Sequence, residues 1–345
     1  MTKQLAFLAV SSIVALIVSG IAAAAGSNCK LVRIEEWPVR LVNNRLLIDG
    51  AINDEKIEIL LDTGAMRTLI FRTAAKRLRL ETRPARGLMF GVGGETKVET
   101  AEPNEIRIGQ VAHKGWPMFV AGEHDPGGNV ALILGEDFFQ QADVEFDLAH
   151  NAVRLFQPLD CHGASLAYWA SGTAGEVEIE RVRESNPQII LPVKINDQSL
   201  DALLDCGAAV SILTKAAAAR LGITPETPGV VRVGSVSGVG LKFVSTYSAP
   251  FQSFAIGNET IRDTSVLFGD VGTDSSHAVR GSVMRYKVGT PTGMILGVDF
   301  LKAHRVLVSH SQRKMYFTYV GGPVFEGAVA PSESKQLSPN PRSIN

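Results

Sequence analysis

Two acidic residues at matched positions are the main candidates for chemistry in this sequence. Asp62 lies in Ile59–Ala65, which reads ILLDTGA, and Asp205 lies in Ala202–Ala208, which reads ALLDCGA. The two residues are 143 positions apart (205 − 62). In each copy an apolar run typical of a buried strand ends at Asp and a Gly turn. A lone carboxylate in such a setting needs a partner or a shifted pKa.

Paired carboxylates of this kind can perform general acid and general base catalysis. If the two copies fold against each other, both groups cannot ionise without strong repulsion, so they share one proton. The ionised member can then take a proton from water while the protonated member donates its own. Because the groups titrate as a pair, the sequence does not say which residue is the acid and which is the base.

An internal repeat surrounds both motifs and supplies the elements that must position them. The repeated segments are Ile52–Asp54 with Ile195–Asp197, Ala74–Leu78 with Ala217–Leu221, Gly91–Gly93 with Gly238–Gly240, and Ile133–Phe138 with Ile295–Phe300. The offset grows from 143 to 147 to 162 along this series, so the second copy is the longer one. Duplication of this extent predicts two similar lobes in one chain.

Short runs of Val, Ile and Thr between 33 glycines indicate an all-β chain. The run from Thr73 to Leu78 is helix-prone. Residues Leu88–Thr100 predict a hairpin with a glycine tip, and Val144–Asp147 with Val153–Phe156 predicts a hairpin that closes the first lobe.

Composition bounds the class of protein and its partners. Hydrophobic residues make up 45% of the 345 residues and charged residues 20%, which is typical of a globular protein of two domains. The net charge of −1 gives no electrostatic reason for a nucleic-acid partner. The seven His residues show no metal-ligand spacing, so neither a metal nor another cofactor is expected.

The first 26 residues predict an export signal. Lys3 precedes an apolar stretch from Leu5 to Val18, and small residues follow over Gly20–Gly26. An uncleaved membrane anchor is the alternative, because the stretch approaches the ~20 residues that a spanning helix needs. We therefore expect a periplasmic or secreted protein, in contact with a membrane only if the segment stays uncleaved.

The remaining boundaries follow from the repeat and from composition. We expect lobe 1 over 30–157, a linker over 158–187, lobe 2 over 188–320, and a disordered tail rich in Pro and Ser over 321–345. Export makes disulfides possible. Cys29 and Cys161 flank lobe 1 and are the candidate pair, the alternative being two free thiols, while Cys206 is expected to stay free.

At these residues the chain resembles the aspartic proteases, and more closely their retropepsin-like type. The resemblance rests on four features in each copy: the apolar run into Asp, the short segment after it, the glycine-tipped hairpin, and the Ile-Leu-Gly segment. It covers nearly all of 40–157 and 188–318. It implies two β-barrel lobes that meet as a pseudo-dimer with their acidic loops face to face.

The resemblance also assigns roles to residues. It makes Asp62 and Asp205 the catalytic pair, the hairpins flaps over an extended peptide, and the Ile-Leu-Gly glycines supports of the acidic loops. The implied loop residues are Thr63, Gly64, Cys206 and Gly207; the flap residues are Met89, Phe90, Gly91, Val92, Gly93, Gly238, Val239 and Gly240; and the supporting glycines are Gly135 and Gly297.

The favoured function is an aspartic endopeptidase that acts on a peptide or protein substrate as a monomeric pseudo-dimer. Cys206 departs from the family, which has Thr or Ser there to hydrogen-bond across to the opposite loop. A thiol is a weak donor, so an alternative is a peptide-binding pseudoprotease. In another alternative each lobe pairs with the same lobe of a second chain. Cys206 as a nucleophile is disfavoured, because no His lies near it in sequence.

Overall fold

The computed structural model describes residues 28–180, 187–271, 276–278, 285–287 and 292–325. The expected export signal lies outside this range. In the described part of the chain no helix is long and apolar enough to cross a membrane. The chain is mostly β-strand with a few short helices, which confirms the predicted fold class.

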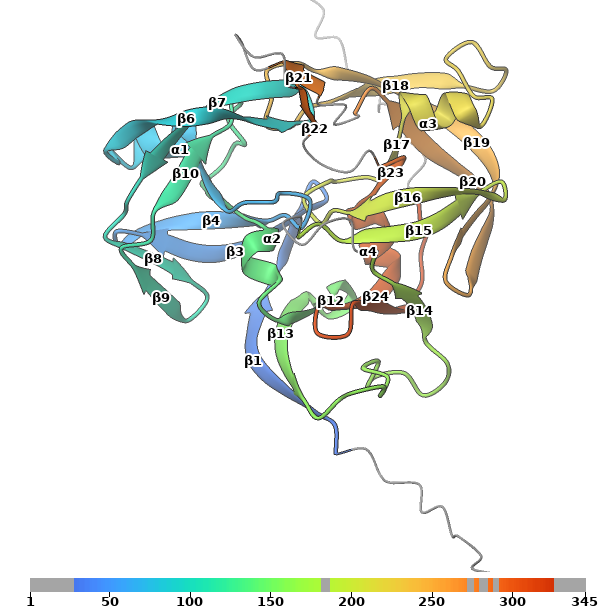
Figure 1. The fold of residues 1–345 in the computed structure, drawn as a ribbon, viewed down its shortest axis with the longest axis horizontal. Coiled ribbons are helices and arrows are strands. Elements are labelled where there is room, and N and C mark those ends of the chain that lie inside the picture. The colour runs from blue at the N-terminus through green and yellow to red at the C-terminus, as the bar shows by residue number, and fades with distance from the viewer. Residues whose placement is uncertain (1–27, 181–186, 272–275, 279–284, 288–291, 326–345) are drawn as a thin grey trace, which may run out of the picture.

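Lobe 1 contains thirteen strands and the short helices that connect them (Figure 1). They are β1 Lys30–Pro38, β2 Arg40–Val42, β3 Arg45–Ile52, β4 Glu55–Leu61, β5 Leu69–Phe71, α1 Arg72–Arg77, β6 Thr82–Gly91, β7 Gly94–Ala101, β8 Glu105–Ile108, β9 Val111–Lys114, β10 Met118–Ala121, β11 Val130–Leu134, α2 Glu136–Phe139, β12 Asp143–Asp147, the 3-10 turn η1 Leu148–His150, and β13 Ala152–Leu159.

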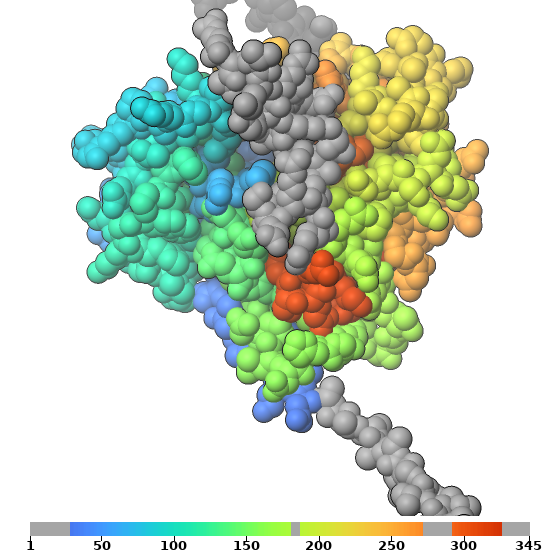
Figure 2. Space-filling view, viewed as in Figure 1, coloured from blue at the N-terminus to red at the C-terminus, as the bar shows by residue number. Residues whose placement is uncertain are grey.

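Lobe 2 repeats this order. Its elements are β14 Gly175–Glu178, β15 Ile190–Ile195, β16 Gln198–Leu204, β17 Ile212–Thr214, α3 Lys215–Arg220, β18 Val231–Val236, β19 Val244–Ile256, β20 Glu259–Gly269, β21 Ser276–Ala278, β22 Arg285–Lys287, β23 Met294–Leu296, α4 Val298–Ala303, β24 His304–Ser309 and β25 Lys314–Tyr319. Figure 2 shows lobe 1 in blue to green on the left and lobe 2 in yellow-green to orange on the right.

Lobe 2 closes into a six-stranded barrel. Its strands pair in the order β15-β16-β23-β17-β20-β19, and β19 pairs back onto β15. In lobe 1 the strand that corresponds to β19 is interrupted: β7 pairs with β10 and β8 pairs with β3, with Pro103 between them. The proline alone does not account for the interruption, because β19 continues through Pro250. In both lobes the strands leading to the acidic motifs, β4 and β16, lie inside the sheet and are buried at their ends.

A third sheet joins the lobes, in the order β1-β13-β12-β24-β25-β14. Each lobe gives three strands, and the central pair β12–β24 is antiparallel, with Glu145 opposite Leu307. Since 145 + 162 is 307, these two residues are counterparts in the repeat, and the pseudo-twofold axis passes between them. Most of the buried apolar side chains of both lobes form one continuous core around this sheet.

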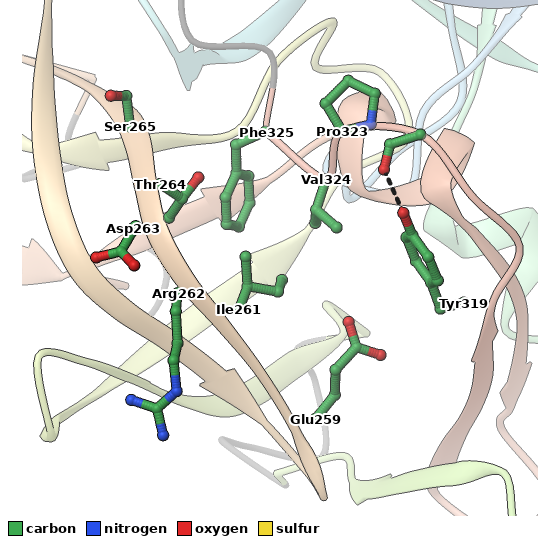
Figure 3. Close-up of a pocket in the computed structure, with 11 residues that line it drawn as sticks. Glu259, Ile261, Arg262, Asp263, Thr264, Ser265, Tyr319, Pro323, Val324 and Phe325 are labelled. Carbon is green, nitrogen blue, oxygen red and sulfur yellow. Dashed lines mark hydrogen bonds between the residues drawn. The ribbon is translucent and has the colours of Figure 1, made fainter.

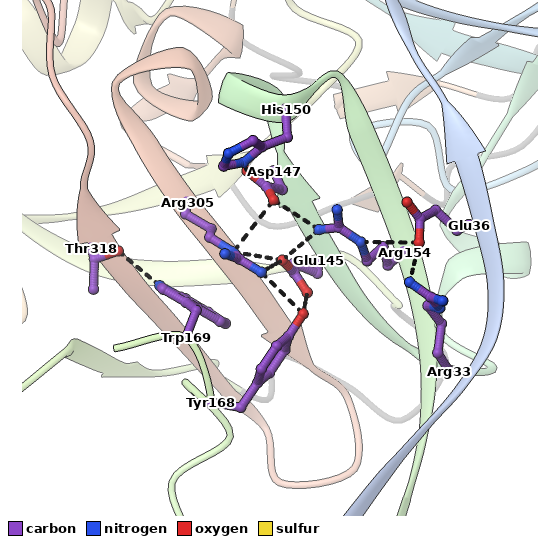
Figure 4. A network of polar contacts seen from close by, with 10 residues as sticks. All are labelled: Arg33, Glu36, Glu145, Asp147, His150, Arg154, Tyr168, Trp169, Arg305 and Thr318. Atoms are coloured by element: carbon purple, nitrogen blue, oxygen red, sulfur yellow. Dashed lines mark hydrogen bonds and ion pairs between the residues drawn. The ribbon is translucent and has the colours of Figure 1, made fainter. Parts of the chain in front are cut away.

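Buried charges cross this joining sheet (Figure 4). The Glu145 side chain is 0% exposed and accepts hydrogen bonds from Arg154 of lobe 1 at 3.0 Å and from Arg305 of lobe 2 at 2.6 Å. Tyr168 donates to its other oxygen at 2.6 Å, and the Arg305 guanidinium also lies over the rings of Tyr168 and Trp169. Pairing on three sides satisfies a carboxylate that would otherwise be costly to bury.

The segment expected to be a linker is part of the fold where it is described. Cys161 forms a disulfide with Cys29, Leu166 is buried, and Glu176-Val177-Glu178-Ile179 includes most of β14, which pairs with β25. The linker assignment missed this strand because Gly, Ser and Pro dominated the composition, although the alternation over 176–179 is a strand signal. The tail also begins later than 321, since Val324 and Phe325 are buried in the core.

Candidate active site

The two acidic loops lie at the centre of the molecule, each held by the same backbone contacts. Asp62 follows β4 and its N–H donates to Leu134 O at 3.0 Å, while Asp205 follows β16 and its N–H donates to Leu296 O at 2.9 Å. The structure therefore places the predicted pair at equivalent points of two related loops.

Each loop packs its glycine against the carboxyl group of the other. A Cβ added to Gly64 would lie 2.4 Å from Cγ of Asp205, and one added to Gly207 would lie 2.3 Å from Cγ of Asp62. Neither position tolerates a side chain without displacing the opposite carboxyl group. The two carboxyl groups thus belong to one site, and glycine is required on both sides for close approach.

The carboxyl groups are hydrogen-bonded to each other and differ in their other partners. Burial, followed by the charge of Asp205, raises the pKa of Asp62 well above its usual range. Burial also raises the pKa of Asp205, while the Gly207 N–H and the hydrogen bond from Asp62 lower it by a smaller amount. Asp205 Oδ1 accepts from Gly207 at 2.8 Å and from Ala208 at 3.1 Å. Asp62 Oδ1 accepts the N–H of Ala65 at 2.8 Å. Since N–H donors favour the ionised form and Asp205 accepts two of them, the shared proton belongs mainly to Asp62.

Thr63 and Cys206 lock the two loops together unequally. The Thr63 hydroxyl donates to Leu204 O at 2.9 Å and accepts from Cys206 N at 3.0 Å. In the opposite direction Cys206 Sγ accepts from Thr63 N at 3.3 Å and, within the described chain, donates no hydrogen bond. Burial, followed by the charge of Asp62, raises the pKa of the Cys206 thiol well above its usual range. The thiol therefore stays protonated, which argues against a nucleophile.

A second pair of side chains supports the loops and was missed by the sequence analysis. Asp137 Oδ1 accepts from the Thr68 N–H and hydroxyl at 2.8 and 2.7 Å, and the Thr68 hydroxyl accepts from Gly135 N at 3.0 Å. Lobe 2 repeats this network with Ser211, Asp299 and Gly297, at 2.9, 2.5 and 2.9 Å. The repeated signal was available, because a hydroxyl residue stands six positions after each motif Asp and an Asp stands two after each supporting Gly.

The supporting glycines lie where no side chain fits. A Cβ on Gly135 would meet Arg67 and Ala65 backbone atoms at 2.7 and 2.8 Å, and one on Gly297 would meet those of Val210 and Ala208 at 2.6 and 2.7 Å. The next residues, Glu136 and Val298, donate their N–H groups to the same loops. Both Ile-Leu-Gly segments therefore pack beside the acidic loops.

The two glycine-tipped hairpins meet at their tips. Hairpin 1, β6–β7, pairs Met89 and Phe90 with the returning strand and has Val92 and Gly93 at its tip. Val92 O and Gly93 O accept from Gly240 N at 3.1 Å and Lys242 N at 3.0 Å of hairpin 2, β18–β19.

The tips also exchange apolar side chains. Val92 packs with the apolar cluster of lobe 2 that contains Ile212 and Ile295, and a Cβ on Gly91 would lie 2.6 Å from Val239 Cγ1. Gly238 in turn packs closely against Val92, with 2.9 Å from an added Cβ to the Val92 Cβ. The two tips are therefore joined by both backbone hydrogen bonds and apolar contacts.

A buried polar pair bridges the lobes beside the site. His310, in the β24–β25 turn, places Nε2 3.3 Å from Oε1 of Glu136. Burial, followed by the charge of Asp137, raises the pKa of Glu136 well above its usual range, and burial lowers the pKa of His310 to about 4. The pair is therefore held as a neutral acid beside a neutral imidazole. At the offset of 162, the corresponding residues in the other lobe are Leu148 and Val298.

No other constellation in the described part of the chain competes with this site. The described residues contain no group of three His, Cys, Asp or Glu side chains placed to hold a metal ion. A surface pocket of about 730 Å³ lies along β20 and the chain after β25 (Figure 3). It is lined by residues such as Arg262, Thr264 and Phe325, and none of its lining residues belongs to an acidic loop or a hairpin tip.

Comparison with known protein families agrees with this geometry. The family model for gag-polyprotein putative aspartyl protease matches residues 48–141, and that for aspartyl protease matches residues 191–300. A search of curated proteins finds no match. Each matched range contains one acidic loop and its Ile-Leu-Gly segment. The chain therefore consists largely of two retropepsin-like aspartyl protease domains in tandem and belongs to the aspartyl protease family.

Proposed function

We propose that the chain is an aspartic endopeptidase whose one active site is formed by Asp62 and Asp205. The observation that carries this proposal is the reciprocal packing of Gly64 on Asp205 and Gly207 on Asp62. This packing brings the two carboxyl groups of a single chain close together, which supports a site in which they share one proton. Both residues retain some solvent exposure, so water can reach them.

The proposed reaction uses the unequal environments of the two carboxyl groups. Ionised Asp205 takes a proton from water, whose oxygen bonds to the carbonyl carbon of an extended peptide, while Asp62 gives its proton to the carbonyl oxygen. The tetrahedral intermediate then collapses. Asp205 gives its proton to the amide nitrogen, Asp62 takes a proton back from one of the two hydroxyl groups, and the C–N bond breaks, which returns the dyad to its one-proton state. The hairpin tips must separate to admit the peptide, and their backbone groups can then pair with it as added strands.

Turnover of an unfolded protein substrate between pH 3 and 7, with and without a pepstatin-type inhibitor, tests the proposal. Asp62→Asn and Asp205→Asn should each abolish turnover without unfolding the protein, whereas Glu226→Gln, at an exposed position, should change nothing. Activity should fall as pH rises, because the required proton leaves the dyad. Full activity in Asp205→Asn would contradict a shared site.

The joining sheet favours the intramolecular pair over homodimers. In the observed register Glu145 faces Leu307 and binds Arg305 of the other lobe. A symmetric pair of two lobes 1 would place Glu145 against a second Glu145, without Arg305, and like charges buried together are strongly unfavourable. The rate should therefore be first order in protein concentration; a second-order dependence at nanomolar protein would contradict an intramolecular site.

A peptide-binding pseudoprotease is the second candidate, favoured by one observation. Cys206 accepts a hydrogen bond from Thr63 but donates none across the loops among the described residues, so only the Thr63 side chain donates between the two loops. If the wild type binds peptides without cleaving them and Cys206→Thr gains cleavage, the pseudoprotease function is correct. If the wild type cleaves, it is not.

We further propose that the protein is exported and that its mature form begins near Ala25–Ser27. The apolar stretch and small-residue run at the N-terminus support this, and the Cys29–Cys161 disulfide is consistent with an oxidising compartment. N-terminal sequencing of the processed protein tests it. Recovery of intact Met1 in a membrane fraction would indicate the anchor instead.

A further inference from the structure

The repeat allows the two sides of the proposed substrate cleft to be compared residue by residue. The pseudo-twofold axis between Asp62 and Asp205 relates equivalent positions on opposite sides of a bound scissile bond. Arg67 and Val210 are such a pair, because each lies five residues after its Asp and each backbone contacts the supporting glycine of its lobe. Any chemical difference between them distinguishes the two sides of the cleft.

On the lobe 2 side, the described residues form an apolar cluster. Val210 packs in one cluster with Ala208 of the acidic loop and with Val92 of the opposite hairpin tip, which places the cluster between the loop and the hairpins. The other members are the buried residues Ile212, Leu267, Val271 and Ile295 and the half-buried residues Val233, Val236 and Val244. A substrate side chain on this side therefore meets only hydrocarbon from the cluster.

The lobe 1 side has polar residues at three equivalent positions. The first is Arg67. Strand register gives the others. Phe119 pairs with Leu69 as Leu267 pairs with Ile212, so Phe119 and Leu267 are equivalent. Four residues further along each chain segment, Glu123 therefore corresponds to Val271. By the same register, with Thr100 opposite Phe119 and Ser248 opposite Leu267, Thr96 corresponds to Val244.

Of these polar groups, only Arg67 is available to a ligand. Glu123 accepts a hydrogen bond from the Thr96 hydroxyl and lies 3.7 Å from the guanidinium of Arg72. Arg72 in turn binds Glu99 at 2.5 Å and Lys97 O at 2.6 Å. Arg67 is exposed, and within the described chain no residue forms a hydrogen bond or ion pair with it. Its guanidinium has five N–H donors in a geometry that matches a carboxylate.

We propose that Arg67 gives the cleft an asymmetric specificity: an apolar substrate side chain binds on the lobe 2 side and an acidic one on the lobe 1 side. This inference rests on the proposed function, since it assumes that a peptide lies across the dyad. The two side chains fall on opposite sides of the scissile bond because the pseudo-twofold axis passes through the dyad.

Peptides that differ at one position as Glu, Gln or Lys, placed on either side of a fixed cleavable bond, test the inference. On one side Glu should be preferred over Gln by about tenfold in kcat/KM, as expected for a charge-assisted hydrogen bond, and the preference should weaken with added salt. Arg67→Gln should abolish the preference and Arg67→Glu should transfer it to Lys. Arg220→Gln, an exposed arginine at the end of α3, is the matched control and should retain it.

Binding of the same peptides to Asp205→Asn separates this inference from the proposed function, because it needs no turnover. Glu-dependent binding that Arg67→Gln removes supports the inference even if the wild type never cleaves. Cleavage with equal rates for Glu and Gln on both sides overturns the inference and leaves the endopeptidase proposal intact. A preference of the wild type for Lys also overturns it, since Glu123 would then control that side, and absence of both binding and cleavage overturns both proposals.

Discussion

The unequal lock between the acidic loops predicts unequal effects of mutating its two members. Thr63→Val keeps the shape of the side chain but leaves two buried backbone groups without a partner, Leu204 O and Cys206 N. Each unsatisfied buried group costs about 1–3 kcal/mol, so the free energy of unfolding should fall by about 2–6 kcal/mol. In the wild type the Thr63 N–H donates to Cys206 Sγ at 3.3 Å. Cys206→Ala leaves only this N–H without an acceptor, so the free energy of unfolding should fall by about 1–2 kcal/mol.

The reverse change should strengthen the lock. Cys206→Thr supplies a hydroxyl that can donate to the lobe 1 backbone as Thr63 donates to lobe 2, and we expect a gain of about 0.5–1.5 kcal/mol. Because Cys206 is fully buried, Cys206→Ser is the matched control, as it adds the hydroxyl without the extra methyl group.

Urea unfolding at fixed pH, followed by fluorescence, measures these differences as shifts in midpoint at constant m-value. kcat/KM should follow the same order as stability, since the lock fixes the geometry of the dyad. Equal losses for Thr63→Val and Cys206→Ala would refute the unequal lock. A loss of stability in Cys206→Ser as well as Cys206→Thr would show that the thiol is the better partner at this position.

Three further predictions concern the joining sheet, the disulfide and the buried imidazole. Arg305→Met should lower the free energy of unfolding by about 1.5–3 kcal/mol in chemical denaturation, more than Arg305→Lys, because Glu145 loses a charged donor in a buried site. Reduction of the disulfide, which spans 132 residues, should cost about 2–5 kcal/mol, measured by unfolding with and without reductant; an unchanged midpoint would contradict this. Burial lowers the pKa of His310 from 6.5 to about 4 in the folded protein. The unfolded chain therefore gains a proton first as pH falls, and stability is lost between pH 6.5 and 4. His310→Leu, which copies its counterpart Leu148, should therefore become more stable relative to wild type by up to about 3 kcal/mol over that range, and parallel pH profiles would contradict it.

Repetition in the sequence was enough to predict the all-β class, the tandem lobes and the family. Each signal was local or periodic: an apolar run before Asp, glycines at the turns, and the same order twice. Prediction of the pair Asp62 and Asp205 required only one further assumption, that the two repeated lobes pack symmetrically against each other. Buried carboxylates need partners, and each motif provides the partner of the other.

The sequence did not reveal the roles of Asp137 and Asp299, because a carboxylate that accepts backbone and hydroxyl donors 69 and 88 residues away leaves no local pattern. Strand β14 was missed for a related reason, since composition was weighed over 30 residues and the alternation spans only four. The sequence placed Cys206 in the second loop but could not show that its thiol accepts from Thr63.

Only the tertiary structure showed which residues give the two lobes different roles. The pairs Glu145 and Arg305, Glu136 and His310, and Arg67 and Val210 are far apart in the sequence, and no motif relates the two members of a pair. Their significance appears when the pseudo-twofold axis sets each beside its partner or opposite its counterpart. The sequence predicts two similar lobes because the same pattern of buried residues occurs twice. The differences between the lobes depend on contacts between residues far apart in the chain, and such contacts leave no periodic pattern in the sequence.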